Sequence, residues 1–350
     1  MKKAELVIVG TGSLAAGLVN ALSQSQVRMR VTVIGRSIAK TSQLVKIANA
    51  RAAMFGTPTR FEGVEIRKFQ ATAFANAFRA LKPWVVFQTA SLQSPWEALE
   101  GENAWTKLVA AAGFGITLPL QMALAAEVSR GAADSDAAVV NASYPDCVNV
   151  ALERLKLRIT CGIGNAAIVE AFCRAGADGN GEVRVVGHHG HFGAWVRGKR
   201  PGRKPRVWVN GREVDALRYS PKLRVEEELN QVTASTAAVV ILGLLTGSTL
   251  RISIPGVGGL PGGYPFEVRK GKFKLELPAG VTKEQALAHN QTGERQDGVE
   301  LGEGVRFTER TRNELAEVGF AYAEGFAYGE WEAARDRMLA LRKRLRGRKG

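Results

Sequence analysis

Residues 4–20 read A-E-L-V-I-V-G-T-G-S-L-A-A-G-L-V-N, and this stretch decides the fold of the chain. Residues 5–9 are short, apolar and β-branched, which is typical of a buried parallel strand, and leucines at helical spacing follow them. Between the two, Gly10 permits a tight turn, and Gly12 lets the backbone approach a pyrophosphate at the helix N-terminus. The stretch therefore predicts a dinucleotide site, with contacts from Gly10, Thr11, Gly12, Ser13, Leu14 and Ala15.

A second strand is expected at residues 30–35, and the residue after such a strand normally contacts the adenosine ribose. Here that residue is Arg36, with Ser37 and Lys40 close behind it. A carboxylate would accept hydrogen bonds from both ribose hydroxyls, whereas these side chains offer donors and positive charge suited to a 2′-phosphate. The sequence therefore favours NADP over NAD as the cofactor. The alternative is a solvated helix start with no ligand.

Strands and helices alternate through the first half of the chain, with further strands expected at 64–69, 84–90 and 137–143. This alternation is the signature of a doubly wound parallel (Rossmann) sheet. Since the second half changes character, we expect an α/β chain with an NADP-binding domain at 1–155 and an α+β substrate domain at 156–350. In the second half we expect a strand at 158–161, a hairpin with arms near 194–196 and 206–209, a helix at 225–245, strands at 250–254, 265–268 and 272–277, and a long helix at 308–346.

The composition narrows the class of protein. The chain has 350 residues, enough for two lobes, and an apolar share of 45%, which is ordinary for a soluble globule. Its best apolar run, at 237–245, is about half the ~18 residues that suggest a membrane span. The N-terminus runs straight into a strand without a signal peptide, and three scattered cysteines make no disulfide framework. We therefore expect a cytoplasmic enzyme that binds no membrane.

Much of the net charge of +15 lies in two segments, 197–206 and 335–349. Neither segment carries interleaved aromatic residues or a nucleic-acid-binding motif. We interpret both as solvated and expect no nucleic-acid partner. The first segment would attract an anionic substrate if it lies near the active site.

Three of the four histidines occur in the stretch G-H-H-G-H-F at 187–192. The cluster follows an expected strand and is flanked by glycines, which suits a base held on a loop over a nicotinamide. Histidines that only cap the strand or bond to backbone remain an alternative. A metal site is a second alternative, although His188 and His189 as neighbours are expected to face apart and no carboxylate is close in sequence.

Two expected strands end in polar or small residues. Thr89 and Ala90 end one of them, and Asn141 and Ser143 end the next. Open α/β sheets bind ligands at the carboxyl ends of their strands. We therefore expect Thr89 and Ala90 to approach the cofactor through backbone groups, and Asn141 and Ser143 to contact its ribose or carboxamide.

Several motifs follow one another in a distinctive order: the G-x-G loop, V-V-x-x-x-x-P at 139–145, a glycine-rich turn into a helix at 162–165, G-x-H-G at 187–190 and a P-G-V-G-G-L-P stretch from 255. This order resembles the lactate/malate dehydrogenase superfamily over nearly the whole chain. The resemblance implies that His189 exchanges a proton with the substrate hydroxyl. It also implies that Asn165 stands where an aspartate orients that histidine, and Ile168 where an arginine binds the substrate carboxylate. We therefore name His189 and Asn165 as catalytic residues and doubt simple lactate or malate chemistry, since isoleucine cannot pair with a carboxylate.

The same superfamily contains the NAD- and manganese-dependent glycoside hydrolases, whose N-x-x-N-P stretch resembles N-A-S-Y-P at 141–145. Gly164 stands where their metal-binding cysteine lies, and Cys161 is the nearest thiol that remains. Loss of a soft ligand removes the natural manganese site, so we expect no metal. An enzyme of this kind is nevertheless the first alternative, and a nucleotide-sensing protein without turnover is the second.

Together these features predict an NAD(P)-dependent oxidoreductase that moves hydride to or from a carbon bearing oxygen or nitrogen. The expected substrate is a small anionic hydroxy/keto or amino/imino compound. The expected assembly is a homodimer or homotetramer.

Overall fold

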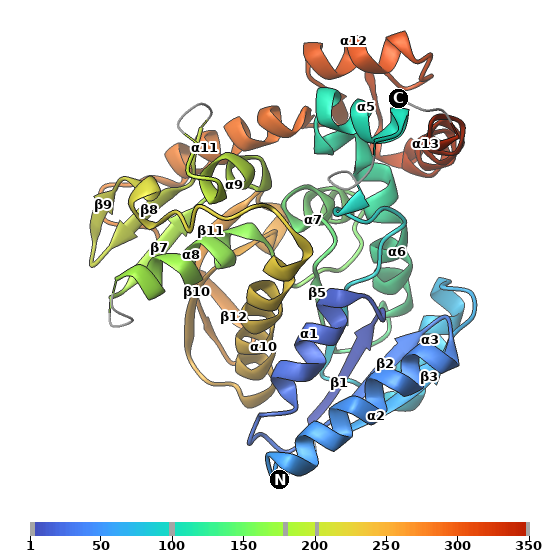
Figure 1. Ribbon diagram of the computed structural model, residues 1–350, viewed down its shortest axis with the longest axis vertical. Helices are drawn as coiled ribbons and strands as arrows, with labels where there is room; N and C mark the ends of the chain where they lie inside the picture. Colours follow the sequence, from blue (N-terminus) through green and yellow to red (C-terminus); the bar gives the residue numbers. More distant parts are fainter. Residues whose placement is uncertain (1–3, 98–101, 178–180, 200–202, 348–350) are drawn as a thin grey trace.

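A six-stranded parallel sheet organises the N-terminal half of the molecule (Figure 1). The computed structural model describes residues 4–97, 102–177, 181–199 and 203–347. The strands occur in the order β3-β2-β1-β4-β5-β6, and each neighbouring pair is parallel. Between β1 and β4 the order reverses, and open α/β sheets bind their ligands at such a point. The strands are β1 (Ala4–Val9), β2 (Met29–Gly35), β3 (Arg60–Glu65), β4 (Val85–Gln88), β5 (Ala138–Asn141) and β6 (Cys161–Gly162).

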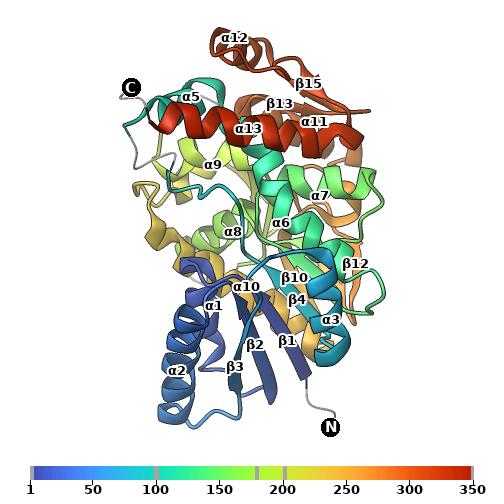
Figure 2. The same ribbon diagram turned by 90° about the vertical axis from the view of Figure 1, so that its right-hand side faces the viewer.

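Helices cover both faces of this sheet (Figures 1 and 2). On one face lie α1 (Ser13–Leu22) and α2 (Ile38–Met54), and on the other α3 (Ala71–Leu81) and α6 (Leu118–Gly131). Alternate residues of β1 enter different cores, because Leu6 and Ile8 pack with α1 whereas Val7 and Val9 pack with α3 and α6. A strand buried on both faces reads as a continuous apolar run. The predicted doubly wound sheet is therefore confirmed.

In the described residues, the C-terminal half contains three antiparallel sheets of three strands each. They are β7 (Val183–Val186), β8 (Arg206–Val209) and β9 (Arg212–Val214); β10 (Leu250–Pro255), β11 (Gly263–Arg269) and β12 (Lys272–Leu275); and β13 (Val299–Leu301), β14 (Val305–Phe307) and β15 (Gly325–Phe326). The remaining helices are α5 (Ala104–Ala112), α7 (Pro145–Arg154), α8 (Asn165–Gly176), α9 (His189–Val196), α10 (Asn230–Thr246), α11 (Lys283–Asp297), α12 (Glu309–Glu317) and α13 (Trp331–Arg346). This mixture confirms an α+β second half. Figure 1 also shows α5 among α12 and α13, so early and late parts of the chain lie together.

Two predicted strands were misplaced. The third strand is Arg60–Glu65 and not 64–69, and the strand expected at 158–161 in the second half is β6. β6 pairs in parallel with β5, and the peptide N–H of Ile163 donates to the carbonyl of Asn141 at 2.9 Å. The parallel sheet therefore extends beyond residue 155, to Gly162.

The predicted hairpin at 194–196 and 206–209 is wrong. Residues 194–196 belong to α9, and β8 pairs instead with β7 and β9. α9 begins at His189 because the side chains of His188 and His191 accept hydrogen bonds from backbone N–H groups at the start of the helix.

The single long helix predicted at 308–346 is also wrong, because α12 ends at Glu317 and the chain passes through β15 before α13 begins. Gly319 and Gly325 lie between the two helices with φ values of +68° and +124°, which side-chain-bearing residues rarely adopt. A Cβ at Gly325 would lie 2.0 Å from the carbonyl oxygen of Val305. Glycine is therefore required where β15 approaches β14.

One helix in the described chain, residues 227–246, is long and apolar enough to span a membrane, and the bent pair 104–112 and 114–131 passes the same test only as a unit. In this structure α10 lies against α1 (Figure 1). A Cβ at Gly17 would approach the Cβ of Ala234 to 2.9 Å. This close packing between helices accounts for the apolar character of α10.

Candidate functional site

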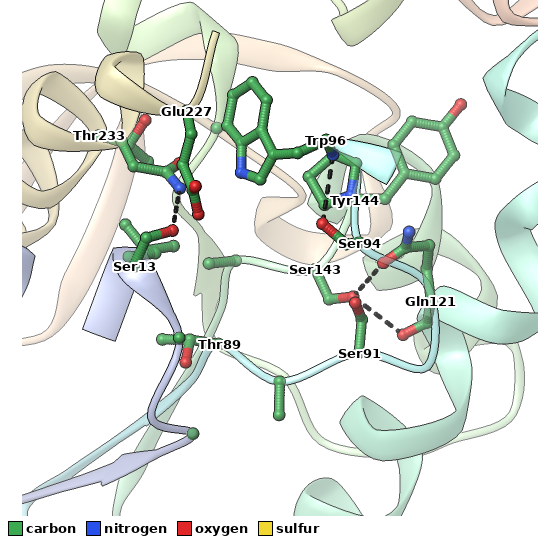
Figure 3. A pocket seen from close by; sticks show the side chains of 18 of the residues that line it. Ser13, Thr89, Ser91, Ser94, Trp96, Gln121, Ser143, Tyr144, Glu227 and Thr233 are labelled. Atoms are coloured by element: carbon green, nitrogen blue, oxygen red, sulfur yellow. Dashed lines mark hydrogen bonds between the residues drawn. The ribbon is translucent and has the colours of Figure 1, made fainter. Parts of the chain in front are cut away.

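A cavity of about 980 Å³ opens at the carboxyl ends of β1, β2, β4 and β5. Residues after each of these strands line it, and α8, α9 and α10 close it from the other half of the chain. In Figure 3, Ser13 faces it from the start of α1, Thr89 from the end of β4 and Thr233 from α10, with Trp96 and Tyr144 further along the wall. One continuous space therefore joins the glycine loop to the histidine cluster.

The glycine loop has the shape of an anion site. Gly10 has φ +123°, and a Cβ there would lie 2.3 Å from Oγ1 of Thr89. At Gly12 a Cβ would meet nothing within 4 Å, so its missing side chain leaves open space above the start of α1. Gly12 precedes α1 with no side chain capping that helix, so the N–H groups of the first turn are available to a ligand. Asn230 on α10 donates to Oγ of Ser13 at 2.8 Å and fixes the opposite wall.

Most of the residues expected to bind the cofactor line this cavity. Two do not: Ala15 of α1 is fully buried in the core, and Asn141, the last residue of β5, is also fully buried. The amide of Asn141 donates to Oδ1 of Asn149 at 2.8 Å and accepts the peptide N–H of Ser143 at 2.9 Å. Asn141 therefore shapes the turn after β5, which corrects the expected ligand contact. The residues that do line the cavity are Gly10, Thr11, Gly12, Ser13, Leu14, Arg36, Ser37, Lys40, Thr89, Ala90 and Ser143.

The end of the cavity beside β2 is basic. Ser37 caps α2, and the guanidinium carbon of Arg36 lies 5.9 Å from the centre of the Phe69 ring. Arg67 also lines the cavity, although it pairs with Glu65 at 3.1 Å, an exposed contact worth little. Arg67 was not predicted as a site residue because the third strand was expected at 64–69, which includes it. In the structure, Arg67 follows β3.

Two of the three clustered histidines are structural. His188 accepts the peptide N–H of Gly190 on Nδ1 at 3.1 Å, and its Nε2 lies 3.4 Å from Sγ of Cys147. His191 accepts the peptide N–H of His188 on Nδ1 at 3.1 Å, and its Nε2 lies 2.9 Å from Oγ1 of Thr292. Burial lowers the pKa of both imidazoles, so they remain neutral in the folded protein. The backbone-capping alternative therefore holds for these two residues.

His189 is the third histidine, and its side chain is 30% exposed at the cavity wall. Its Nδ1 lies 2.8 Å from Oδ2 of Asp297, and its peptide N–H donates to Oδ1 of Asp146 at 3.1 Å. The ring stacks on Phe114 with centroids 4.7 Å apart and meets the edge of Tyr144 at 5.1 Å. With Nδ1 bound to a carboxylate, Nε2 is the nitrogen left to exchange a proton with a ligand.

Asp297 is the electrostatic centre of the cluster. Its buried Oδ2 accepts the hydroxyl of Tyr144 at 2.9 Å and lies 3.5 Å from Nδ1 of His188. Burial favours the protonated form of the Asp297 carboxyl. The charge of the His189 imidazole and its hydrogen bond outweigh this effect, so the pKa of Asp297 is lowered. Burial likewise lowers the pKa of His189, and the Asp297 carboxylate more than offsets this, so the pKa of His189 is raised. The pair is arranged to stabilise an imidazolium.

This arrangement corrects two expectations. Asp297, from the last residue of α11, takes the position at Nδ1 of His189 that was expected for Asn165, which only lines the cavity at the start of α8. His188 and His189 were expected to face apart, yet both reach Oδ2 of Asp297. Asp297 lies 108 residues from His189 in sequence, and no local pattern marks it as a partner.

Neither a protein-family model nor a curated protein sequence matches the chain. Solved structures do. A lactate dehydrogenase from Cryptosporidium parvum, solved with lactic acid and β-nicotinamide adenine dinucleotide, is 14% identical, with a TM-score of 0.53 over 85% of this chain and 99% of that one. A malate dehydrogenase from the same organism is 12% identical, with a TM-score of 0.54 over 90% of this chain and 99% of that one. A lactate dehydrogenase from Eimeria maxima with NADH and oxamate has a TM-score of 0.51 and 12% identity, over 85% and 92% of the two chains.

The chain has the lactate/malate dehydrogenase fold. At this identity the likeness concerns the fold, so the chemistry must be argued from the residues of the site.

The lactate/malate dehydrogenase fold here carries an apolar wall beside His189. Ile168 is buried one turn into α8, and with Phe114 and Phe192 it lines the cavity near the imidazole. The buried carboxylate of Asp146 also lines this part, and burial raises its pKa. The position at which the resemblance places a carboxylate-binding arginine is therefore occupied by a buried apolar side chain.

Cys161, the thiol nearest to the expected metal position, does not line the cavity. Cys161 is fully buried on β6, and burial raises the pKa of its thiol to about 12. Gly164 lies against Pro145 and Pro255, without a ligand atom of its own. Across residues 4–97, 102–177, 181–199 and 203–347, no group of three or more His, Cys, Asp or Glu side chains is placed to hold a metal ion.

The loop after β4 is tied to the C-terminal helix. Glu97 forms a two-fold ion pair with Arg346, and Arg342 donates to the carbonyl of Leu92 and to Oε1 of Gln93. Gln93 also accepts Nε1 of the buried Trp105 at 3.1 Å. These contacts hold residues 91–97, including Trp96, along one wall of the cavity.

Proposed function

We propose that the protein is an NADP-dependent oxidoreductase in which His189 exchanges the proton that accompanies hydride transfer at a carbon bearing oxygen or nitrogen. One observation carries the proposal: the His189–Asp297 pair lies in the same cavity as the open glycine loop of α1. A solvated structural histidine would need neither a buried carboxylate on Nδ1 nor a place in the dinucleotide cavity.

The proton chemistry follows from the hydrogen bonds of the pair. Asp297 accepts Nδ1–H, which fixes the tautomer and leaves Nε2 toward the cavity. In the reductive direction the imidazolium donates its Nε2 proton to the substrate oxygen or nitrogen, and in the oxidative direction the neutral ring removes it. When bound, the nicotinamide supplies or accepts the hydride. The raised pKa of His189 keeps more of it protonated near neutral pH, which suits a proton donor.

The cofactor assignment rests on two parts of the cavity. The uncapped start of α1 and the open space at Gly12 fit a pyrophosphate. Arg36, Lys40 and Arg67 surround the far end and offer charge to a 2′-phosphate, which favours NADP over NAD.

The proposal is tested by measuring loss of NADPH absorbance over a panel of small keto and imino compounds. We expect turnover with at least one of them, and a fall in kcat/KM of roughly two to four decades in His189→Gln with NADPH affinity nearly unchanged. His289→Gln, which changes a histidine outside the cavity lining, is the matched control. Full turnover in His189→Gln would refute the assignment. Tight NADPH binding without turnover of any compound would favour the sensor alternative.

A further inference from the structure

Asp146 is a buried carboxylate that meets the cavity beside His189. It lies in the first turn of α7, is only 1% exposed and belongs to the cavity wall. Its Oδ1 accepts the peptide N–H of His189 at 3.1 Å. Within the described parts of the chain, no donor reaches Oδ2, and this oxygen is not sealed inside the protein. The contact with His189 therefore accounts for one of the two carboxylate oxygens.

A glycine keeps the second oxygen open. A Cβ at Gly164 would stand 3.3 Å from Oδ2 of Asp146, and Gly164 also lines the cavity. The backbone of Gly164 is extended, with φ −162°, so its conformation does not require glycine. The missing side chain leaves Oδ2 uncovered toward the cavity. Since a buried charged group without a partner is costly, this oxygen is arranged to meet a donor of a ligand.

The part of the cavity at His189 carries an excess of negative charge. Asp297 and Asp146 both raise the pKa of the imidazole, and among the described residues no Lys or Arg is a source of its shift. His188 stays neutral because burial lowers its pKa. The His189 imidazolium compensates the carboxylate of Asp297, to which it is hydrogen-bonded. The charge of Asp146 is then left for a cation from outside the protein.

Aromatic rings form the wall next to these carboxylates. Phe114 lies with its ring centre 4.7 Å from that of His189 and 5.0 Å from that of Tyr144. Phe192 and Trp96 also line the cavity, and Figure 3 shows Trp96 and Tyr144 on its wall. Ring faces attract organic cations, most strongly where water is excluded. The wall and the free carboxylate oxygen therefore favour the same kind of ligand.

On the basis of the proposed function, we infer that the substrate reacts at a carbon–nitrogen bond and that its iminium form pairs with Oδ2 of Asp146. In the reductive direction the His189 imidazolium gives its Nε2 proton to the imine nitrogen. The carbon of the resulting iminium receives the hydride that the nicotinamide supplies when bound. The electron pair of the C=N π bond moves onto nitrogen, which leaves a neutral amine. One proton and one hydride are consumed for each C=N bond reduced.

The two carboxylates then have complementary roles. Asp297 stabilises the proton while it is on the imidazole, and Asp146 stabilises it once it is on the substrate. A ketone would fit this site less well, because negative charge develops on its oxygen as the hydride arrives. A carboxylate without a partner opposes that charge, whereas it stabilises an iminium.

Direct binding tests the inference without turnover. Isothermal titration of the purified full-length protein, without cofactor, compares 2-phenylpyrrolidine, an ammonium ion near pH 7.5, with 2-phenyltetrahydrofuran, a neutral ether of the same shape. We expect the amine to bind at least about tenfold more tightly than the ether. Equal affinities for the two compounds in the parent protein would overturn the inference.

Variants assign the preference to Asp146. Asp146→Asn keeps an oxygen for the peptide N–H of His189 but loses the charge, so the amine is expected to lose its advantage while the ether binds as before. Gly164→Ala places a methyl group against Oδ2 without changing any charge, and it is expected to weaken amine binding as well. Asp134→Asn, an exposed change outside the cavity lining, is the control. A preference that survives in Asp146→Asn, or one that is lost only in Glu227→Gln, the other carboxylate of the described lining, would overturn the assignment.

Turnover separates this inference from the proposed function. With NADPH, we expect kcat/KM for 2-phenyl-1-pyrroline, a cyclic imine that persists in water, to exceed that for phenyl propyl ketone by at least about tenfold, and Asp146→Asn to reduce only the imine reaction. A preference for the ketone would overturn the inference and leave the proposed function intact. Full turnover in His189→Gln would overturn the proposed function itself, whereas amine binding to Asp146 would be unaffected.

Discussion

Replacing Asp297 by asparagine isolates the carboxylate that acts on His189. Oδ2 of Asp297 lies 2.8 Å from Nδ1 of His189, accepts Tyr144 at 2.9 Å and lies 3.5 Å from Nδ1 of His188. An asparagine has nearly the same shape but only one acceptor atom. If its NH₂ group faces His189, the imidazole must accept on Nδ1 and carry its proton on Nε2, which is the wrong tautomer for a base.

The size of the effect follows from these contacts. The variant loses the charge that offsets burial at His189, so we expect the pKa of His189 to fall and its imidazolium to be less stable. Together with the tautomer change, kcat/KM is expected to fall by roughly two to four decades. In the reductive direction the rate declines as pH rises through the pKa of His189, and this decline is expected to begin at lower pH in Asp297→Asn.

Two assays measure this. Imidazole resonances followed by NMR between about pH 5 and pH 9 report the pKa directly, and a chain with only four histidines can be assigned by single substitutions. Initial rates with the best substrate of the panel give the pH profile. Asp134→Asn, which changes an exposed aspartate outside the cavity, controls for a general effect of charge. If Asp297→Asn has an unshifted His189 pKa and a kcat/KM within about threefold of the parent, the pair does not work as described.

Three further predictions concern the cofactor, the capping histidines and metals. NADP(H) is expected to bind at least about tenfold more tightly than NAD(H), and Arg36→Asp is expected to narrow or reverse this preference by titration; equal affinities in the parent would refute the argument. His188→Gln is expected to lower the free energy of unfolding near pH 7.5 by roughly 1 to 2 kcal/mol, because a helix cap is lost in a buried site. Because the pKa of His188 is lowered in the folded state, the unfolded chain binds more protons as pH falls below 6.5, and the free energy of unfolding then declines. This decline is expected to be less steep in His188→Gln. Urea denaturation at several pH values measures it, and the same pH dependence in parent and variant would contradict the argument. Chelator-treated protein is expected to keep its NADPH-dependent activity, and activity lost on chelation but restored by manganese would favour a glycosidase.

The sequence predicted those features that depend on residues close together in the chain. The glycine loop and the alternating strands depend on local spacing, and both were predicted. Asp297 was missed because its contact with His189 joins residues 108 positions apart, and only the packing of α11 beside α9 brings them together. Asn141 was expected to contact the ligand because it ends a strand, and that position was correct. Its side-chain amide, however, donates a hydrogen bond to Asn149 inside the protein, which the sequence does not reveal.

The final strand of the parallel sheet determines how the molecule may be divided. β6 lies beyond residue 155, so a fragment ending there would leave Val140 and Asn141 of β5 without their partner strand. Unprotected edges promote pairing between chains, and α5 would at the same time lose its packing against α12 and α13. The half that carries the parallel sheet is thus not an interchangeable module. A graft onto another C-terminal half would have to carry residues through Gly162 and supply a substitute for the C-terminal helices.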